Sequence, residues 1–177
     1  MKWKQEEIFW NFLLTVFAIL CFPVNPLVLT GGLETGFNHI AYTAGWVTWG
    51  FGMALVFAPI VVFPRRGEVE EGKSFVHTTR LVDNGIYSLV RHPQYLGGIL
   101  AIFVTTLLWY PHWLFGLLGA MGTITIYVST KQEEEYLREK FGIDYETYMK
   151  RIPRMNILVG IIRKVRIKLK GRTPVRK

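Results

Sequence analysis

Three long uncharged blocks constrain the fold of this chain more than any other feature. Residues 8–33, 35–64 and 92–130 contain no Lys, Arg, Asp or Glu. An α-helix needs roughly 20 mostly apolar residues to cross the ~30 Å hydrocarbon core of a bilayer. The first two blocks are each long enough for one crossing, and the third is long enough for a tight hairpin of two short crossings. We therefore expect an all-α, multi-span integral membrane protein.

The composition agrees with membrane insertion, because 50% of the residues are hydrophobic and the mean hydropathy is +0.24. We place four transmembrane helices at residues 8–29, 40–63, 94–110 and 113–130, with residues 110–112 at the tip of the last hairpin. The first block is longer than the apolar core of a secretory signal peptide, which is about 7–15 residues. We therefore expect it to remain as a membrane span.

The basic residues fall on one side of these spans. The connections at 30–39 and 110–112 contain no Lys or Arg, whereas basic residues are found before the first span, between the second and third spans, and after the fourth. Cytoplasmic connections of membrane proteins carry an excess of Lys and Arg. We expect both termini on the cytoplasmic side. The basic residues that define this topology are Lys2, Lys4, Arg65, Arg66, Lys73, Arg80, Arg91 and those from Lys131 onward.

The C-terminal segment 155–177 begins with apolar residues at 155–162 and continues with Arg163, Lys164, Arg166, Lys168 and Lys170. A segment of this kind is typical of binding to an anionic cytoplasmic leaflet, and a short fifth membrane element is the alternative. Nucleic-acid binding is the competing interpretation of a basic tail. The net charge of +8 is already explained by the membrane surface, so we expect no nucleic-acid partner.

Two polar clusters flank the third uncharged block, one at residues 91–95 and one at 133–135. Taken singly, they are typical of membrane anchoring and of a solvated helix start. Because a hairpin lies between them, both clusters are expected at the same membrane face, where ionisable groups are functional candidates. A ligand with both charge signs, such as S-adenosylmethionine, suits them. Arg91 is suited to its carboxylate, a Glu to its ammonium or ribose hydroxyls, and His92, Tyr87 or Tyr95 to hydrogen bonding or stacking.

Metal and dinucleotide sites are not indicated. The four histidines, His39, His77, His92 and His112, are scattered, and Cys21 is the single cysteine. No metal-ligand spacing and no internal disulfide therefore exist in this sequence. There is also no Walker-type loop and no Gly-x-Gly-x-x-Gly motif.

Several local signals predict where helices begin and end. Pro93 suits the first turn of the third span, and Gly142 is expected to end a helix over 131–141. Residues 86–90 are expected to form a short helical turn after the turn signal at 83–85. A further short helix is expected to begin near 144 and to end before Pro153. Six glycines in the spans are expected to allow close helix packing: Gly45, Gly50, Gly52, Gly116, Gly119 and Gly122.

The ordered motifs resemble a known family. They are Leu-Val-Asp-Asn-Gly-Ile-Tyr at 81–87, Arg-His-Pro-Gln-Tyr-Leu-Gly at 91–97, and Glu133 and Glu134 followed by Leu137, Phe141, Gly142, Tyr145 and Tyr148. Over residues 80–154 this combination resembles the isoprenylcysteine carboxyl methyltransferases, and the phospholipid N-methyltransferases share part of it. The resemblance implies a cytoplasmic-side S-adenosylmethionine pocket, with a lipid-like substrate entering from the bilayer.

The resemblance also implies roles for single residues. Arg91 is the candidate catalytic residue, because it can orient either the substrate carboxylate or the cofactor. The whole chain, 1–177, is expected to be a single methyltransferase domain, with N-terminal spans at 1–63, a motif-bearing catalytic region at 64–154 and a basic tail at 155–177. The implied cofactor contacts are Arg80, Leu81, Val82, Tyr87, His92, Pro93, Tyr95, Glu133 and Glu134.

The implied reaction is S-adenosylmethionine-dependent methylation of the α-carboxylate of a prenylated cysteine or a similar lipid-like acceptor. A carboxylate is already an anion at neutral pH, so its methylation needs positioning and exclusion of water and no general base. A protonated amine would need a base such as a Glu or a Tyr. Three alternatives remain open: a phospholipid N-methyltransferase, a membrane reductase that uses a nicotinamide cofactor, and a non-enzymatic membrane scaffold.

Overall fold

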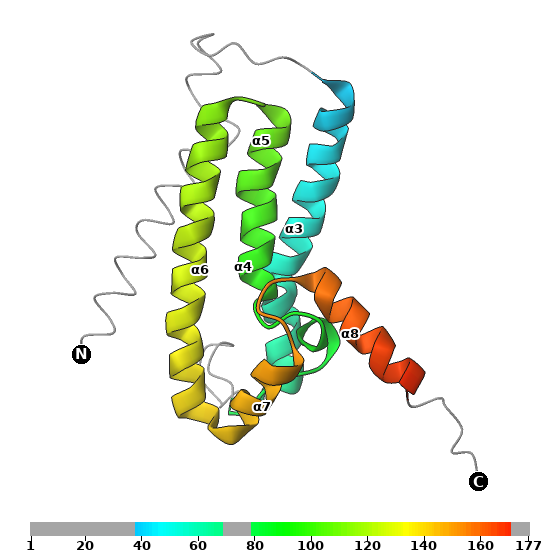
Figure 1. Cartoon of the computed structure of the whole chain (residues 1–177), viewed down its shortest axis with the longest axis vertical. Coiled ribbons are helices and arrows are strands. Elements are labelled where there is room, and N and C mark those ends of the chain that lie inside the picture. The colour runs from blue at the N-terminus through cyan, green and yellow to red at the C-terminus, as the bar shows by residue number, and fades with distance from the viewer. Residues whose placement is uncertain (1–37, 69–78, 171–177) are drawn as a thin grey trace. The chain divides into compact units, whose positions relative to one another are not determined.

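The computed structural model describes residues 38–68 and 79–170, which contain helices and connecting segments and no strand. The expected span at 8–29 lies outside the described residues. The elements (Figure 1) are α3 (His39–Arg66), the 3₁₀ helix η1 (Gly85–Ser88), α4 (Pro93–Gly98), the π-helix η2 (Ile99–Val104), α5 (Thr105–Trp109), α6 (Trp113–Phe141), α7 (Ile143–Arg151) and α8 (Ile157–Lys170).

Two of the helices, α3 and α6, are long and apolar enough to cross a membrane. They correspond to the spans expected at 40–63 and 113–130, and α6 continues beyond the expected end. The segment expected to span at 94–110 forms the shorter apolar helix Pro93–Trp109. Within residues 38–68 and 79–170, the structure therefore shows two candidate spans by length and composition, and the four spans that the sequence predicts are not shown.

The chain divides into two compact units. Among the described residues, the first unit contains 38–57 and 94–135, and the second contains 58–68, 79–93 and 136–170. Both α3 and α6 contribute to each unit.

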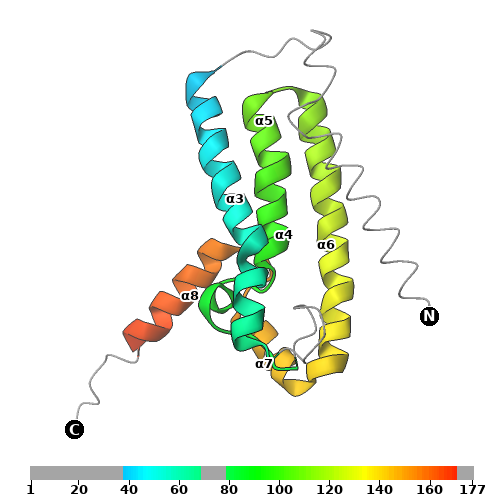
Figure 2. The ribbon, with the colours of Figure 1, turned by 180° about the vertical axis from the view of Figure 1, so that it is seen from behind.

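In the first unit, α4, η2 and α5 lie between the first part of α3 and the first part of α6 (Figures 1 and 2). Glycines make this packing close. A Cβ atom added at Gly52 would lie 2.7 Å from the backbone nitrogen of Ala101, and one added at Gly122 would overlap the ring of Phe103. Small residues let the helix backbones approach in this way. Gly50 differs, because no atom of the described residues lies within 4 Å of a Cβ added there.

The π-helix η2 interrupts the helical segment between α4 and α5. The Thr105 hydroxyl donates to the carbonyl of Leu100 at 2.9 Å, five residues earlier, and lies 3.5 Å from the carbonyl of Gly45 on α3. Single π-turns inside α-helices are often found at functional sites. Here the π-helix follows directly on the motif at 91–97.

In the second unit, the predicted helix ends are confirmed. The helix α6 ends at Phe141, and Gly142 has a φ of 56° while its N–H donates to the Arg138 carbonyl at 2.8 Å. Only glycine adopts this backbone conformation readily. The helix α7 ends at Arg151, before Pro153, and η1 begins at Gly85, which also has a positive φ of 62°.

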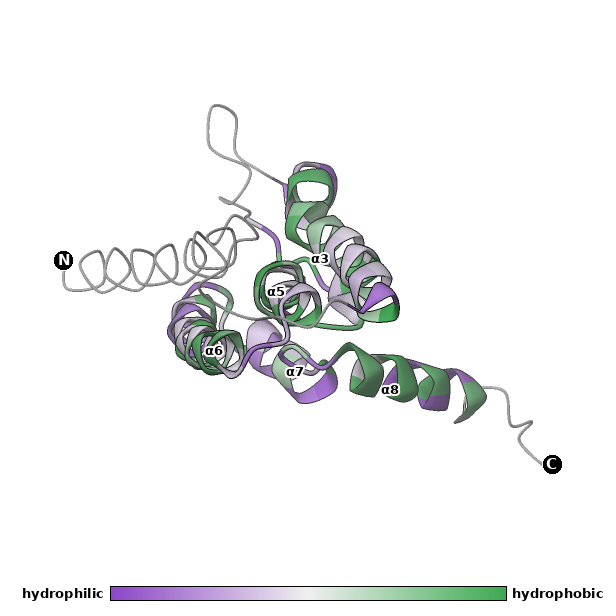
Figure 3. Ribbon diagram, turned by 90° about the horizontal axis from the view of Figure 1, so that it is seen from above, coloured by the Kyte–Doolittle hydropathy of each residue, from purple (hydrophilic) through white to green (hydrophobic). Residues whose placement is uncertain are grey.

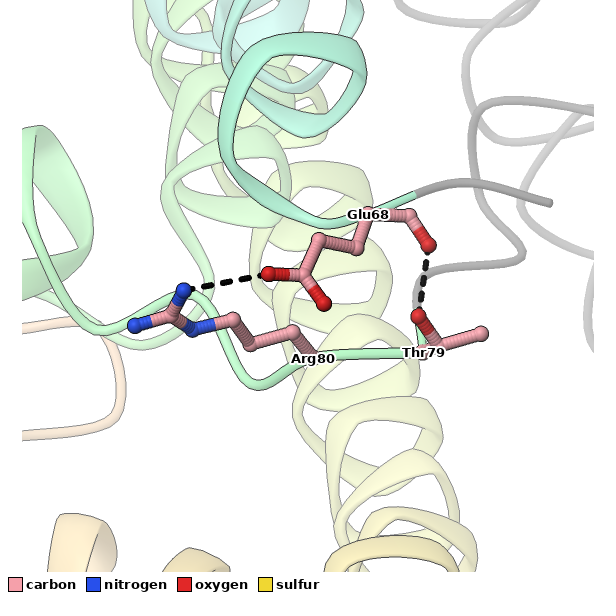
Figure 4. A network of polar contacts seen from close by, with 3 residues as sticks. All are labelled: Glu68, Thr79 and Arg80. Carbon is pink, nitrogen blue, oxygen red and sulfur yellow. Dashed lines mark hydrogen bonds and ion pairs between the residues drawn. The ribbon is translucent and has the colours of Figure 1, made fainter.

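The connection after α3 returns close to its starting point in the second unit (Figure 4). The Thr79 hydroxyl donates to the Glu68 carbonyl at 2.6 Å, and the Arg80 guanidinium donates to the Glu68 carboxylate at 3.1 Å. The backbone N–H groups of Thr79 and Arg80 both donate to the Gly67 carbonyl, at 3.0 and 3.1 Å. These hydrogen bonds hold Arg80, the first residue of the motif segment, next to the end of α3.

Candidate functional site

The Arg-His-Pro segment is held through its backbone in the second unit. The N–H of Arg91 donates to the carbonyl of Pro153 at 3.0 Å, and the N–H of His92 donates to the carbonyl of Arg154, also at 3.0 Å. The His92 side chain is 1% exposed. The segment that follows α7 therefore fixes the position of two predicted site residues. The motif alone does not predict these hydrogen bonds between distant parts of the chain.

Tyr87 lies in the same unit, on η1, and is also buried. Its ring stacks on Phe63 with 5.2 Å between the centroids, and its carbonyl accepts a 2.7 Å hydrogen bond from the Tyr148 hydroxyl. Burial, together with the neighbouring hydroxyls of Tyr145 and Tyr87, raises the pKa of Tyr148. The Tyr148 hydroxyl therefore stays protonated at neutral pH and acts as a fixed donor that holds η1.

The predicted stretch from Arg80 to Val82 has mixed surroundings. Arg80 is exposed and pairs with the exposed Glu68 carboxylate at 3.1 Å. Leu81 is half-buried, whereas Val82 belongs to the buried core. Val82 thus supports the packing of the second unit, and Arg80 holds the connection from α3.

The acidic cluster and Tyr95 lie in the first unit. Along α6, Glu133 is half-buried, Glu134 is 2% exposed and Glu135 is exposed. Tyr95 is half-buried on α4. Burying a carboxylate is costly unless it is hydrogen-bonded or paired. Burial therefore distinguishes Glu133 and Glu134, which the sequence analysis selects, from the solvated Glu135.

Gln94, the second residue of α4, is not among the site residues predicted from the sequence. Its side-chain oxygen Oε1 is buried and accepts no hydrogen bond from the described residues. A buried amide oxygen without a donor is costly and calls for a partner. Its position inside the 91–95 cluster was the available signal, and Gln94 is a further candidate for cofactor binding.

The two units hold different polar groups. The second unit contains the cation of Arg91, the imidazole of His92 and the aromatic ring of Tyr87, which suit a carboxylate and a flat ring of a ligand. The first unit contains the carboxylate of Glu133 and the amide of Gln94, which suit an ammonium or hydroxyl groups. Within the described ranges, no three His, Cys, Asp or Glu side chains are placed to hold a metal ion.

These features define a helical protein with candidate membrane spans and a polar site rich in charged and aromatic groups. Comparison with known families makes this more specific, because residues 40–144 match the phospholipid methyltransferase family. The match covers more than half of the chain, so this protein belongs to that family. Two apolar helices and a membrane methyltransferase family together indicate a location in the membrane.

The similar proteins of known name are methyltransferases. A methanethiol S-methyltransferase of Pseudomonas deceptionensis is 31% identical over 120 residues, which are 65% of this chain and 44% of that protein. Methanethiol S-methyltransferase 1 of Bradyrhizobium diazoefficiens is 39% identical over 67 residues, which are 38% of this chain and 22% of that protein. Methanethiol S-methyltransferase 2 of the same organism is 38% identical over 68 residues, which are 38% of this chain and 25% of that protein. The chain thus spans less than half the length of these relatives. No solved structure matches it.

Proposed function

We propose that this protein is an S-adenosylmethionine-dependent methyltransferase that acts at the cytoplasmic membrane face on the carboxylate of a prenylated cysteine or a similar lipid-like acceptor. The observation that carries the proposal is the family match over residues 40–144, which includes both the 91–95 cluster and Glu133. The family favours a methyltransferase over the nicotinamide-dependent reductase and over the scaffold.

The side chains of the two clusters are assigned roles by their charge and burial. Glu133 and Glu134 would bind the ammonium or ribose hydroxyls of the cofactor, and the buried His92 and Tyr87 would hydrogen-bond or contact its flat ring. When bound, S-adenosylmethionine supplies a methyl group on a positively charged sulfur to an electron-rich atom of the acceptor. Buried surroundings at these residues exclude water, which strengthens the electrostatic interactions that orient the reactants.

Arg91 is the candidate for orienting the acceptor. It is half-buried, and its backbone is fixed by the bond to Pro153. A guanidinium holds a carboxylate through two parallel hydrogen bonds, which sets the direction of the attacking oxygen. Because the carboxylate is ionised at neutral pH, no side chain needs to remove a proton from it.

A thiol is the second candidate acceptor, because the relatives with names are methanethiol S-methyltransferases. Thiols are mostly protonated at neutral pH, with a reference pKa of about 8.5 for cysteine. Methylation of a thiol would therefore use a base, for which the imidazole of His92 and the carboxylate of Glu133 are the candidates. A phospholipid amine, which the family description suggests, would need a base for the same reason.

An acceptor panel tests this proposal. The purified protein is incubated with methyl-labelled S-adenosylmethionine and, separately, with N-acetyl-farnesylcysteine, methanethiol or phosphatidylethanolamine. We expect label in the farnesylcysteine ester, released as methanol by mild base. Label in dimethyl sulfide or in the lipid headgroup would move the assignment to the thiol or the amine. No transfer to any of the three would contradict the proposed acceptor class.

A further inference from the structure

A cavity of about 170 Å³ lies in the second unit, bordered by η1, the C-terminal end of α7 and α8. This basic pocket is lined mainly by Asp83, Ser88, Arg151, Arg163, Lys164 and Ile167. A single water molecule needs only about 10–15 Å³ of such space, so the pocket has room for a larger polar group. None of its lining residues is among the predicted cofactor contacts.

The pocket has an excess of positive charge. Its lining contains three cations and one carboxylate, and the Arg151 guanidinium is 3.5 Å from the Asp83 carboxylate. The Lys164 ammonium donates to the Ser88 hydroxyl at 2.7 Å, and the Arg163 guanidinium donates to the Arg151 carbonyl at 3.2 Å. Over the described ranges, neither Arg163 nor Lys164 has a carboxylate partner. Two fixed cations with neutral partners are suited to bind phosphate oxygens.

Close docking of α8 builds the pocket. A Cβ atom added at Gly160 would overlap the carbonyl of Leu89, so a glycine is required where α8 touches the backbone that follows η1. Gly160, Arg163, Lys164 and Ile167 are spaced at i, i+3, i+4 and i+7, which places them on one face of the helix. Docking at Gly160 therefore presents both cations to the pocket.

The other face of α8 is apolar and exposed. Figure 3 shows hydrophobic and hydrophilic residues interleaved along α8. The helix contains five basic residues and no acidic one. A helix with an apolar face and many Lys and Arg residues typically lies in the interface of an anionic membrane. The exposed apolar side chains are Leu158, Ile161, Ile162, Val165 and Leu169, with exposed fractions of 42–68%.

We propose that the basic pocket binds the phosphate of an anionic membrane lipid, while the exposed apolar face of α8 enters the adjacent leaflet. The pocket alone would suit any phosphate, and the adjoining apolar face favours a lipid as its source. The cations of the pocket are complementary to the negative charge of the lipid phosphate. The helix α8 provides both the headgroup contacts and the acyl-chain contacts. The bound lipid is a membrane attachment and not the methyl acceptor.

Native mass spectrometry of the full chain in detergent tests this site, with phosphatidylglycerol and phosphatidylcholine supplied in equal amounts. We expect one retained phosphatidylglycerol molecule and binding weakened about a hundredfold in R163Q/K164Q, because each of the two lost charge-assisted hydrogen bonds weakens binding by about tenfold. The matched control R166Q/K168Q removes the same charge from the same helix outside the pocket lining and should retain the lipid. Equal losses in the two double variants would overturn the proposal.

Two further measurements keep the test decisive. Ser88→Asp places a carboxylate beside Lys164 without removing a cation, and it should abolish the retained phosphatidylglycerol even if R163Q/K164Q folds poorly. Wild-type retention by this variant would overturn the site. Millimolar inorganic phosphate should leave the lipid adduct in place, and its displacement would show that the pocket is a site for free phosphate. Neither readout requires methyl transfer, so failure here is distinct from failure of the proposed function.

Discussion

Glu133 and Glu135 lie two positions apart on α6 and differ in exposure, since Glu133 is half-buried and Glu135 is solvated. If Glu133 binds the cofactor, Glu133→Gln removes a charge-assisted hydrogen bond worth about 1.5–3 kcal/mol. We expect the dissociation constant for S-adenosylmethionine to rise by roughly tenfold or more. Isothermal titration calorimetry measures this change directly.

Glu135→Gln is the matched control, because it removes the same charge from the same helix at an exposed position. It should leave the affinity for S-adenosylmethionine within about twofold of the wild type, because surface charges contribute little. Equal weakening by the two variants would indicate only a long-range charge effect. A large loss of turnover in Glu133→Gln with unchanged affinity would contradict the cofactor-binding role.

Tyr148 allows a test at the residue scale that is independent of ligand. Tyr148→Phe removes the donor to the buried Tyr87 carbonyl, which should cost about 1–3 kcal/mol of stability. The pKa of Tyr148 is raised by burial, so the unfolded chain loses this proton first, near pH 10. The stability that the neutral hydroxyl gives is thus complete below pH 10 and declines as the pH rises further.

Thermal unfolding of the wild type and Tyr148→Phe from pH 8 to pH 11 measures both effects. The wild type should melt at the higher temperature at pH 8, and the difference should narrow towards pH 11. Parallel curves across this range would show that the hydroxyl is not buried in the folded protein.

Among the elements, α3 and the helical segment after Pro93 depend on glycine for close packing in the first unit. Gly52→Ala would place a Cβ 2.7 Å from the Ala101 nitrogen and 2.8 Å from the Gly97 carbonyl, where backbone atoms cannot yield easily. We expect a loss of about 1–3 kcal/mol, typical of overpacking. Gly50→Ala, two residues earlier on the same helix, has open space and should be neutral or stabilising. A thermal-shift assay in detergent that showed equal losses for both would be evidence against this packing.

The boundaries of elements were largely predictable from the sequence. Pro93 begins α4, residues 110–112 separate α5 from α6, and Gly142 ends α6. These signals are local, because proline and glycine restrict or free the backbone at their own positions. The rotation of α3 about its axis explains why Gly52 packs closely and Gly50 does not. This rotation was not predictable from the sequence. The π-helix at Ile99–Val104 also has no signal in residue type.

The candidate site was predictable as a set of residue types and less so as a structure. The motif selects His92 and Tyr87, and both are buried. The bonds from residues 91–92 to residues 153–154 and from Tyr148 to Tyr87 join segments about 60 positions apart. Pairings over such separations depend on the tertiary fold. Which glutamate of the Glu133–Glu135 cluster is buried likewise depends on the rotation of α6 about its axis, which the sequence does not specify.

At the scale of the whole molecule, the distribution of Lys and Arg predicts that both termini lie in the cytoplasm. A fusion of alkaline phosphatase after Lys177 should be inactive in bacterial cells, and a fusion of green fluorescent protein there should fluoresce. Active phosphatase with a dark fluorescent protein would place the C-terminus outside and would reverse the predicted side of the cofactor site.

The most direct test of the central claim is S-adenosylmethionine binding to the detergent-purified protein by isothermal titration calorimetry, with NADPH as the comparison ligand. We expect saturable binding of S-adenosylmethionine near one molecule per chain and much weaker binding of NADPH. Binding of NADPH in preference to S-adenosylmethionine, or binding of neither, would contradict the assignment as a methyltransferase.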